Sequence, residues 1–384
     1  MDVINLTGGA GERGFQQGAL MKERFGEMLK SFFSSELWLD NRPAPLPPVL
    51  VKAALGFLGA ARIKKTVRRR LPLQAERLSG TALGLGIAER LLWGVHYLEI
   101  MLCEAGKSLK APGGCTQLHV QPGAAADGKP LMGRNYDFPN FLRPYQIVRR
   151  EFPSERGRLA TITVTQAPLV GAHQGINETG LAAAANNARL WKGKDLRAGG
   201  VPYLFILQEI LETCRTVSEG VELITGFPDR SNAGFFGIMD STGDSRVVEF
   251  TASRAAVREA DGAGVIAQTN HFHLLKDANL PDGTYWTVKG MEGLEFATST
   301  TARFEAGNAL LHEKAGNINV EALTAMLRDH GGGGEGGDCT ICCHGAAGSS
   351  LASIIADVSE RALWVAEGNP CAAEYAKIGF DERK

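Results

Sequence analysis

The tetrapeptide Gly113-Gly114-Cys115-Thr116 combines residue types that could support self-cleavage followed by catalysis. A glycine before the cysteine permits backbone conformations closed to other residues, so the thiol could reach the carbonyl behind it and take the acyl group from nitrogen to sulfur. Hydrolysis of that thioester would free the α-amine of Cys115, whose intrinsic pKa of about 7.7–8.0 suits a base near neutral pH. Taken alone, such a tetrapeptide more often marks a core cysteine after two turn glycines.

Five further motifs follow Cys115, and their order is more informative than any one of them. They are Gly133-Arg134-Asn135-Tyr136-Asp137, Gly175-Ile176-Asn177-Glu178-Thr179-Gly180-Leu181 with Asn187 after it, Ile238-Met239-Asp240-Ser241-Thr242-Gly243 leading into Val247-Val248-Glu249, Gln268-Thr269-Asn270, and Thr301-Ala302-Arg303-Phe304. In this order and spacing, over about 250 residues, the chain resembles the choloylglycine hydrolase family of N-terminal-nucleophile (Ntn) hydrolases, whose mature proteins begin with cysteine. The long segment before Cys115, together with residues 349–357 and 368–371, is more similar to the isopenicillin N acyltransferase branch of that superfamily.

The resemblance implies a role for six side chains. Cys115 would be the nucleophile, freed by cleavage after Gly114, and Asn270 with a backbone N–H would stabilise the oxyanion. Asp137 would orient the α-amine and Arg134 would favour the thiolate by its charge. The polar network would be completed by Asn187 and Arg303.

Structural explanations exist for the same residues without the resemblance. Arg134 and Asp137 could form an ion pair at the edge of a turn, and Asn270 could be a turn residue. The choice of Asn187 stays open, because Asn186 stands beside it.

The first 114 residues are expected to form a helical prosegment rather than a sheet. Helical periodicity runs through residues 16–38 and 74–103, and a proline-rich connector at residues 42–48 separates the two stretches. After self-cleavage, residues 1–114 would form the α chain, and residues 115–384 the Ntn-hydrolase catalytic domain, the β chain.

From Cys115 onward, short apolar or alternating runs between turn signals predict antiparallel strands. We expect strands at residues 115–120, 131–136, 159–165, 181–186, 235–239, 246–250 and 265–268, and a last hairpin from 351–357 and 362–367. Helical patterns at 202–215, 302–313 and 320–329 interrupt them, which favours an α+β fold. The resemblance implies its form, a four-layer αββα Ntn-hydrolase sandwich with the helical prosegment in front.

Composition excludes several other classes of protein. The 384 residues are 44% hydrophobic with a formal net charge of -1, so the chain lacks the excess of basic residues that is typical of a nucleic-acid-binding protein. We interpret the basic run at 64–70 as a solvated helix face. Neither a signal peptide nor a membrane span is recognisable, and seven cysteines spread over the chain favour a reducing cytoplasm.

Other motifs are poor matches to known chemistry. The run 123–129 matches most of a phosphate-binding loop, but Pro130 replaces the Ser/Thr that would hold magnesium, so Asp127-Gly128 is interpreted as a hairpin turn. Cys339-Thr340-Ile341-Cys342-Cys343-His344 has no second ligand pair at zinc-finger spacing, so its cysteines are interpreted as buried structural thiols and no metal is predicted. No role is assigned to His119, His173, His271 or His273.

The leading hypothesis is therefore hydrolysis of a linear amide, an N-acyl bond, through an acyl-Cys115 intermediate taken by water. Acyl transfer to an amine, or from a thioester, is the alternative, and a non-catalytic binding protein is the third. No cofactor is expected, and the expected partner is a small N-acyl amide or acyl thioester. Neither nucleic acid nor a membrane is expected as a partner, and a homo-oligomer is compatible with the sequence.

Overall fold

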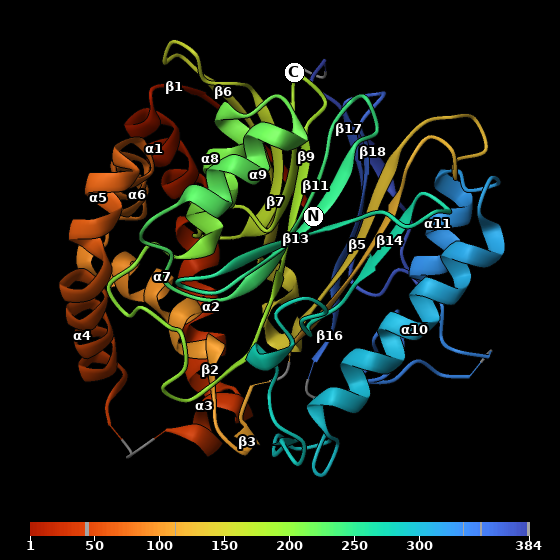
Figure 1. Ribbon diagram of the computed structural model, residues 1–384. Coiled ribbons are helices and arrows are strands. Elements are labelled where there is room, and N and C mark those ends of the chain that lie inside the picture. Colours follow the sequence, from red (N-terminus) through yellow and green to blue (C-terminus); the bar gives the residue numbers. More distant parts are fainter. Residues whose placement is uncertain (43–45, 112, 333, 346–347, 382–384) are drawn as a thin grey trace.

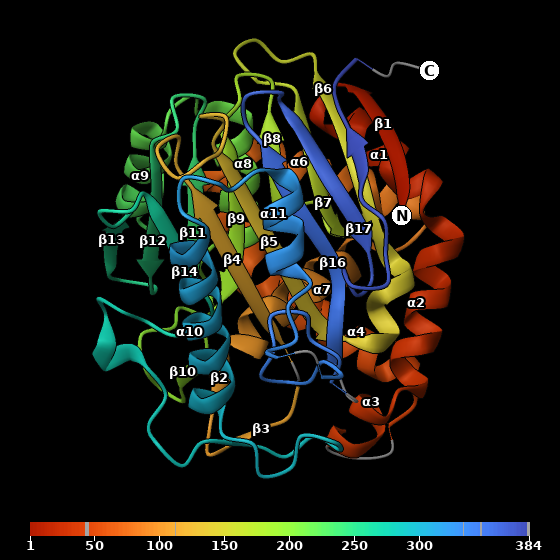
Figure 2. The same cartoon turned by 90° about the vertical axis from the view of Figure 1, so that its right-hand side faces the viewer.

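The computed structural model describes the whole chain except residues 43–45, 112, 333, 346–347 and 382–384. In this described part, two stacked sheets lie between two layers of helices, as Figure 1 shows from left to right. The expected αββα arrangement is therefore confirmed. The N-terminus and the last described residues lie on the same side of the sandwich (Figure 2).

The large sheet has the strand order β1-β6-β7-β8-β9-β11-β12-β13 among the described residues. Its strands are β1 (Asp2–Gly8), β6 (Gln146–Pro153), β7 (Thr161–Gln166), β8 (Gln174–Asn177), β9 (Ala182–Asn187), β11 (Gly234–Met239), β12 (Ser245–Phe250) and β13 (Ala255–Glu259). The neighbours pair antiparallel except β1 and β6, which run parallel.

The small sheet has the order β14-β4-β5-β16-β17-β18, and its strands all pair antiparallel. Its strands are β4 (Gly114–Val120), β5 (Leu131–Pro139), β14 (Val265–Gln268), β16 (Gly348–Asp357), β17 (Ala362–Glu367) and β18 (Ala376–Ile378). The turn at Asp127-Gly128 lies in the connection between the paired strands β4 and β5, as the sequence predicted, and Gly128 has a φ of +71°.

Alternation along the strands separates the core into layers. In β9, Ala182 and Ala184 face the other sheet, whereas Ala183 and Ala185 face the helices. Since successive strand residues point to opposite faces, a strand buried on both sides is apolar throughout and shows no polar alternation.

Helices cover the outer face of each sheet. On the large sheet lie α8 (Tyr203–Thr213) and α9 (Val217–Gly226), and on the small sheet lie α10 (Phe296–Lys314) and α11 (Val320–Leu327) (Figures 1 and 2). Short pairings, β10 (Leu190–Trp191) with β2 (Glu104–Ala105) and β15 (Tyr285–Trp286) with β3 (Ser108–Leu109), fix the stretch that leads into β4.

The segment before Cys115 is mainly helical but contributes a strand that the sequence did not predict. Its helices are α1 (Ala10–Leu20), α2 (Lys22–Ser34), α3 (Glu36–Asn41), α4 (Pro48–Gly59), α5 (Lys65–Arg70), α6 (Pro72–Leu85) and α7 (Glu89–Cys103), with a π-helical turn, Ala60–Lys64, after α4. The expectation of helix without sheet is wrong for β1, which extends the large sheet at its edge, and for the short strands β2 and β3. The predicted helix at 74–103 is divided at Gly86, whose φ of +69° ends α6.

Glycines allow α1 and α6 to pack backbone against backbone. A Cβ at Gly80 would lie 2.1 Å from the carbonyl oxygen of Gly11, and one at Gly14 would lie 2.1 Å from the oxygen of Arg77. No side chain fits at that separation, so these positions require glycine for close helix contact.

A buried ionic cluster joins the N-terminal helices to the large sheet and α8. Arg13 of α1 and Arg77 of α6 contact Glu151 of β6 and Glu212 of α8, and Arg149 of β6 lies 3.0 Å from Glu151. All five side chains are at most 1% exposed. Removing one charge from such a cluster is costly, because its partners stay buried without compensation.

The surface features agree with the modest net charge of the chain. The basic run of α5 forms exposed ion pairs, with Arg69 and Arg70 on Asp229 and Arg68 on Glu89, as expected for a solvated helix face. Of the helices in the described ranges, none combines the length and the apolar character needed to cross a membrane.

Candidate active site

Cys115 lies at the start of β4, with its side chain buried between the two sheets (3% exposed). Its strand neighbours at two-residue spacing, Gln117 and His119, face the same layer. Gln117 donates to Asn186 Oδ1 (2.8 Å), and His119 Nδ1 is 2.7 Å from Ser245 Oγ. One face of β4 is therefore a polar row inside an otherwise apolar core, and Cys115 is at its end.

The amide nitrogen, the carbonyl oxygen and the sulfur of Cys115 are each held by a different side chain. The Cys115 N–H donates to Asn270 Oδ1 (3.0 Å), and Arg303 Nη1 donates to the Cys115 carbonyl oxygen (2.7 Å). Arg134 Nη2 donates to Cys115 Sγ (3.1 Å). Three of the side chains predicted from the sequence thus converge on the predicted nucleophile.

Arg303 and Asn270 form one unit, positioned by α10. Arg303 Nη2 donates to Asn270 Oδ1 (2.9 Å), and the Asn270 main-chain N–H donates to Thr300 Oγ1 (2.9 Å). Thr300 and Arg303 are three residues apart on the helix, so they share the face that packs on β4 and β14. This explains why a helix far along the chain carries a site residue.

The two adjacent asparagines of β9 are used differently. The Asn186 side chain accepts from Arg134 Nε (3.2 Å) and donates to the carbonyl oxygens of Gln268 (3.1 Å) and Cys115 (3.4 Å). Asn187 instead offers its main-chain oxygen to Asn270 Nδ2 (2.8 Å). Asn186 is therefore a member of the site that the sequence motifs did not assign, and the predicted pocket role of the Asn187 side chain stays a prediction.

Asp137 lies on β5 opposite Gly114, the residue before the nucleophile. Its Oδ1 accepts from Ser350 Oγ (2.6 Å), while its buried Oδ2 has no hydrogen-bond partner within the described ranges and would lie 3.1 Å from a Cβ on Gly114. A bulge of β16 next to Ser350 shifts the register here. Because Arg134 and Asp137 are three residues apart on a strand, their side chains point to opposite faces, which argues against a simple ion pair between them.

Burial dominates the electrostatics of the intact site. It raises the pKa of the Cys115 thiol, although the Arg134 guanidinium acts in the opposite direction. Burial also raises the pKa of Asp137, against the effect of Arg303. In the intact chain the charge of Arg134 does not outweigh desolvation, so the pKa of the thiol lies above its ordinary value.

A small pocket opens beside Gly114, the residue before Cys115. Six of the residues that line it are Gly114, Asp137, Phe138, Trp286, Met291 and Arg303. The lining thus combines aromatic and thioether groups with the guanidinium of Arg303 and two acids, Asp137 and Asp338. The pairing of β3 with β15 brings both the approach to the cleavage site and Trp286 to this pocket.

The histidines are consistent with structural roles. Burial lowers the pKa of His119 to about 3 and that of His271 to about 4, so both are neutral at physiological pH. In the described part of the chain, the surroundings of Cys115 contain no cluster of metal-ligating side chains.

The same residues lie within a region that matches a known family. The family model described as "Acyl-coenzyme A:6-aminopenicillanic acid acyl-transferase" matches residues 124–372, nearly two thirds of the chain. That range includes Arg134, Asp137, Asn187, Asn270 and Arg303, and it begins nine residues after Cys115. No curated protein matches the sequence.

Several solved structures resemble the chain at low identity. The Caenorhabditis elegans ortholog of N-acylethanolamine-hydrolyzing acid amidase is 14% identical with a TM-score of 0.43, covering 64% of this chain and 93% of that protein. A variant of the conjugated bile acid hydrolase from Clostridium perfringens is 16% identical (TM-score 0.46; 70% and 94% covered). Penicillin V acylase from Agrobacterium tumefaciens is 12% identical (TM-score 0.42; 70% and 87% covered). Similarities of this size say nothing about what the chain acts on.

Proposed function

The chain belongs to the acyl-coenzyme A:6-aminopenicillanic acid acyl-transferase family, and we propose that it is a cysteine Ntn hydrolase that cleaves itself before Cys115 and then cleaves a linear N-acyl amide. The observation that carries the proposal is the convergence of Arg134, Asn270 and Arg303 on the sulfur, nitrogen and oxygen of Cys115. The main-chain groups of any buried cysteine need partners, but an arginine on the sulfur is a contact that an ordinary core cysteine does not need.

Self-cleavage would begin with attack of Cys115 Sγ on the Gly114 carbonyl carbon. A C–S bond forms and the Gly114–Cys115 C–N bond breaks, so the acyl group moves to sulfur. The thiol proton passes to the nitrogen, which leaves as an amine. Asn270 Oδ1, which already accepts the N–H of this peptide, can keep that nitrogen in place. Water then hydrolyses the thioester, leaving a carboxylate on Gly114 and a free thiol on Cys115.

The released amine would give the buried carboxylate of Asp137 a hydrogen-bond partner. In the intact chain one Asp137 oxygen is buried without a partner among the described residues and faces Gly114. An α-ammonium on Cys115 would supply a charged donor beside it, so cleavage converts an unfavourable buried carboxylate into a partner of the new terminus.

Turnover would use the same atoms. The α-amine takes the thiol proton as Cys115 Sγ attacks the substrate carbonyl, and the proton passes to the leaving amine as the acyl thioester forms. Water attacks the thioester and releases the acid. Asn270 with a backbone N–H would stabilise the oxyanion, an effect worth roughly 3–4 kcal/mol per donor in other enzymes.

Acyl transfer is a second candidate, because the family model that matches is that of an acyl-transferase. The difference is the acceptor: an amine in place of water attacks the acyl-Cys115 thioester. The apolar walls formed by Phe138, Trp286 and Met291 suit an apolar acyl group in either case.

Intact mass under denaturing conditions tests the first step. Wild type should yield fragments of 114 and 270 residues, the larger beginning at Cys115, and Cys115→Ala should remain one chain. Cys214→Ser, a buried cysteine far from the site, should process like wild type. A chain that remains whole, or one that Cys115→Ala still cleaves at this bond, refutes the mechanism and favours a non-catalytic protein.

Trapping the acyl-enzyme tests the second step. Processed protein is incubated with a series of N-acyl p-nitroanilides of increasing acyl length, with and without hydroxylamine. An acyl adduct on the 270-residue fragment, with release of p-nitroaniline, supports amide cleavage through Cys115. Conversion of the product from acid to hydroxamate in proportion to hydroxylamine favours transfer, whereas unchanged acid release favours hydrolysis.

A further inference from the structure

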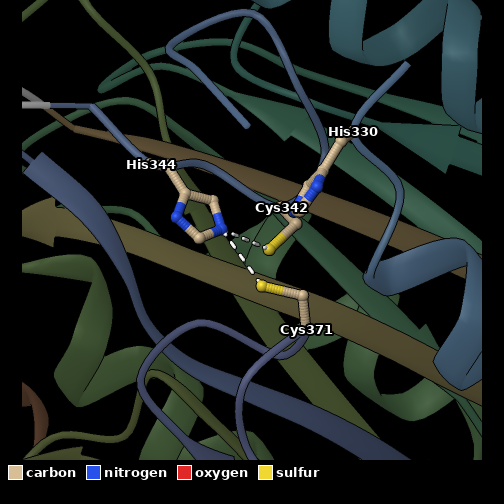
Figure 3. Close-up of side chains that lie close together, drawn as sticks. All are labelled: His330, Cys342, His344 and Cys371. Atoms are coloured by element: carbon tan, nitrogen blue, oxygen red, sulfur yellow. Dashed lines mark hydrogen bonds between the residues drawn. The ribbon is translucent and has the colours of Figure 1, made fainter. Parts of the chain in front are cut away.

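A second group of reactive side chains lies outside the Cys115 site. Figure 3 shows His330, Cys342, His344 and Cys371 pointing toward one another, the first three from the loop between α11 and β16 and the last from the turn after β17. One ligand atom from each, an imidazole nitrogen or a thiol sulfur, lies within 4.8 Å of the others. The cluster therefore joins the loop between α11 and β16 to the turn after β17.

The distances fit a shared tetrahedral centre. His344 Nε2 is 3.3 Å from Cys342 Sγ and 3.2 Å from Cys371 Sγ. A zinc ion bound tetrahedrally, at about 2.3 Å from sulfur and about 2.0–2.1 Å from nitrogen, separates such ligand atoms by about 3.6 Å. Two of the six separations are thus within a few tenths of an ångström of the tetrahedral value, and all six are at most 4.8 Å.

His330 is oriented as a metal ligand. Its Nδ1 is 3.1 Å from the carbonyl oxygen of Gly334, which fixes the proton on Nδ1 and leaves the lone pair on Nε2. Nε2 is buried and, among the residues that the structure describes, has no hydrogen-bond partner. A histidine that binds a metal through one ring nitrogen usually donates the N–H of its other ring nitrogen to a carbonyl or carboxylate oxygen.

The glycine-rich loop is shaped around the two imidazoles. A Cβ on Gly336 would lie 2.4 Å from Cδ2 of His344 and 3.0 Å from Cδ2 of His330. Any other residue at this position would push the rings apart, so the glycine permits both nitrogens to reach the same point.

We propose that His330, Cys342, His344 and Cys371 form a structural Cys2His2 zinc site. Two thiolates and two neutral imidazoles give Zn²⁺ its preferred soft and borderline ligands, and the complex has no net charge. All four positions are occupied by protein, so the ion holds the loops together and has no open position for substrate. The sequence motif at 339–344 shows only two of the ligands, because His330 is 12 residues before Cys342 and Cys371 is 29 after it.

The site would also fix one wall of the catalytic pocket, a consequence that rests on the proposed function. Cys343, between two of the ligands, lines that pocket, and its main chain bonds Ser350 in both directions (3.0 and 3.2 Å). Ser350 Oγ in turn donates to Asp137. Zinc would thus hold the residue that positions Asp137.

The test is metal content of untagged full-length protein, produced with zinc in the medium and measured by inductively coupled plasma mass spectrometry. Wild type should contain close to one zinc per chain, and Cys371→Ser should contain close to none. The matched control is Cys339→Ser, in the loop that carries Cys342 but outside the cluster, which should keep its zinc. Because Cys371 is exposed, its replacement leaves the core intact, and a circular dichroism spectrum verifies folding.

A second measurement replaces the metal. Removal of zinc and addition of Co²⁺ should give the visible absorption of tetrahedral cobalt with thiolate ligands in wild type and Cys339→Ser, and lose it in Cys371→Ser. Protein without metal, equal zinc in all three proteins, or a Cys342–Cys371 disulfide in the freshly isolated chain would overturn the proposal. Because metal content is independent of cleavage at Cys115, its outcome can differ from that of the proposed function.

Discussion

Replacement of Arg77 by methionine should destabilise the chain strongly, because Arg77 lies at the centre of the buried ionic cluster. The substitution keeps most of the side-chain volume and removes the charge that contacts Glu151 and, at 3.3 Å, Glu212. Both carboxylates are fully buried. Breaking such a cluster from one side costs about 3–5 kcal/mol, since the remaining charge is left uncompensated.

The remaining contacts set where in this range the effect should fall. Glu151 keeps Arg149 at 3.0 Å, whereas Glu212 keeps Arg158 and Arg13 at the longer distances of 3.5 and 3.9 Å. Burial already raises the pKa of Glu212, so proton uptake there can relieve part of the penalty. We therefore expect about 3 kcal/mol, the lower end of the range.

The assay is urea unfolding in the Cys115→Ala background, where the chain stays in one piece and stability does not depend on fragment concentration. Arg68→Met is the matched control, because its half-exposed ion pair with Glu89 should contribute less than about 1 kcal/mol. Glu212→Gln added to Arg77→Met should recover part of the loss, although alone it destabilises. A cost for Arg77→Met no greater than the control, or strictly additive effects in the double variant, would refute the reasoning.

Three further outcomes follow from the fold and the site. Burial raises the pKa of Asp137 above 3.8, so the contribution of Asp137 to stability is present below that pH and is lost as pH rises. In the Cys115→Ala chain, Asp137→Asn should therefore gain stability relative to its parent as pH rises toward neutrality. A pH-independent difference in urea unfolding would contradict this. Gly80→Ala should lower the free energy of unfolding by about 1–3 kcal/mol, because the added methyl group clashes with Gly11. Gly26→Ala, with open space around it, should raise the free energy of unfolding by about 0.5–1 kcal/mol. Equal midpoints of unfolding would be incompatible with this packing. The two fragments of processed protein should co-elute on size-exclusion chromatography without denaturant, because the ionic cluster and the β1–β6 pairing join them; elution of a separate 114-residue fragment would show that these contacts do not hold it.

Most strands of the small sheet, and β7, β9, β11 and β12 of the large one, were predictable, because their apolar runs end at strong turn signals. Examples are β4, β14, β16 and β17, each found close to its expected position. The edge strands β1 and β13 were missed, since their exposed, mixed residues resemble a loop. The sequence also did not predict β6, β8 and the short β18. The pairing of β1 joins residues almost 150 positions apart, which no local pattern reports.

The N-terminal helix α4 was missed for a different reason. Its sequence, residues 48–59, is apolar on nearly all sides, so it lacks the polar face that marks an amphipathic helix. It begins directly after the prolines of the expected connector, part of which lies outside the described residues. Pro48 stands at its first position, where proline is well tolerated.

In the candidate site, the motifs located Cys115, Arg134, Asn270 and Arg303 because each is tied to a short pattern. Asn186 could not be distinguished from Asn187 in advance, because the four alanines before them give no alternation from which the inward face could be read. The contact of Asp137 with Ser350 depends on the β16 bulge, which sequence alone does not reveal.

The position of β1 at the edge of the large sheet has a consequence for truncated genes. A chain that starts at Cys115 would have the terminal residue of the processed enzyme but would expose the full length of β6, with its unpaired main-chain groups. An uncovered strand of that kind is a template for pairing between molecules. A gene shortened to begin at this cysteine should therefore give aggregated protein, and soluble enzyme should require that the N-terminal residues are made first and cut afterwards.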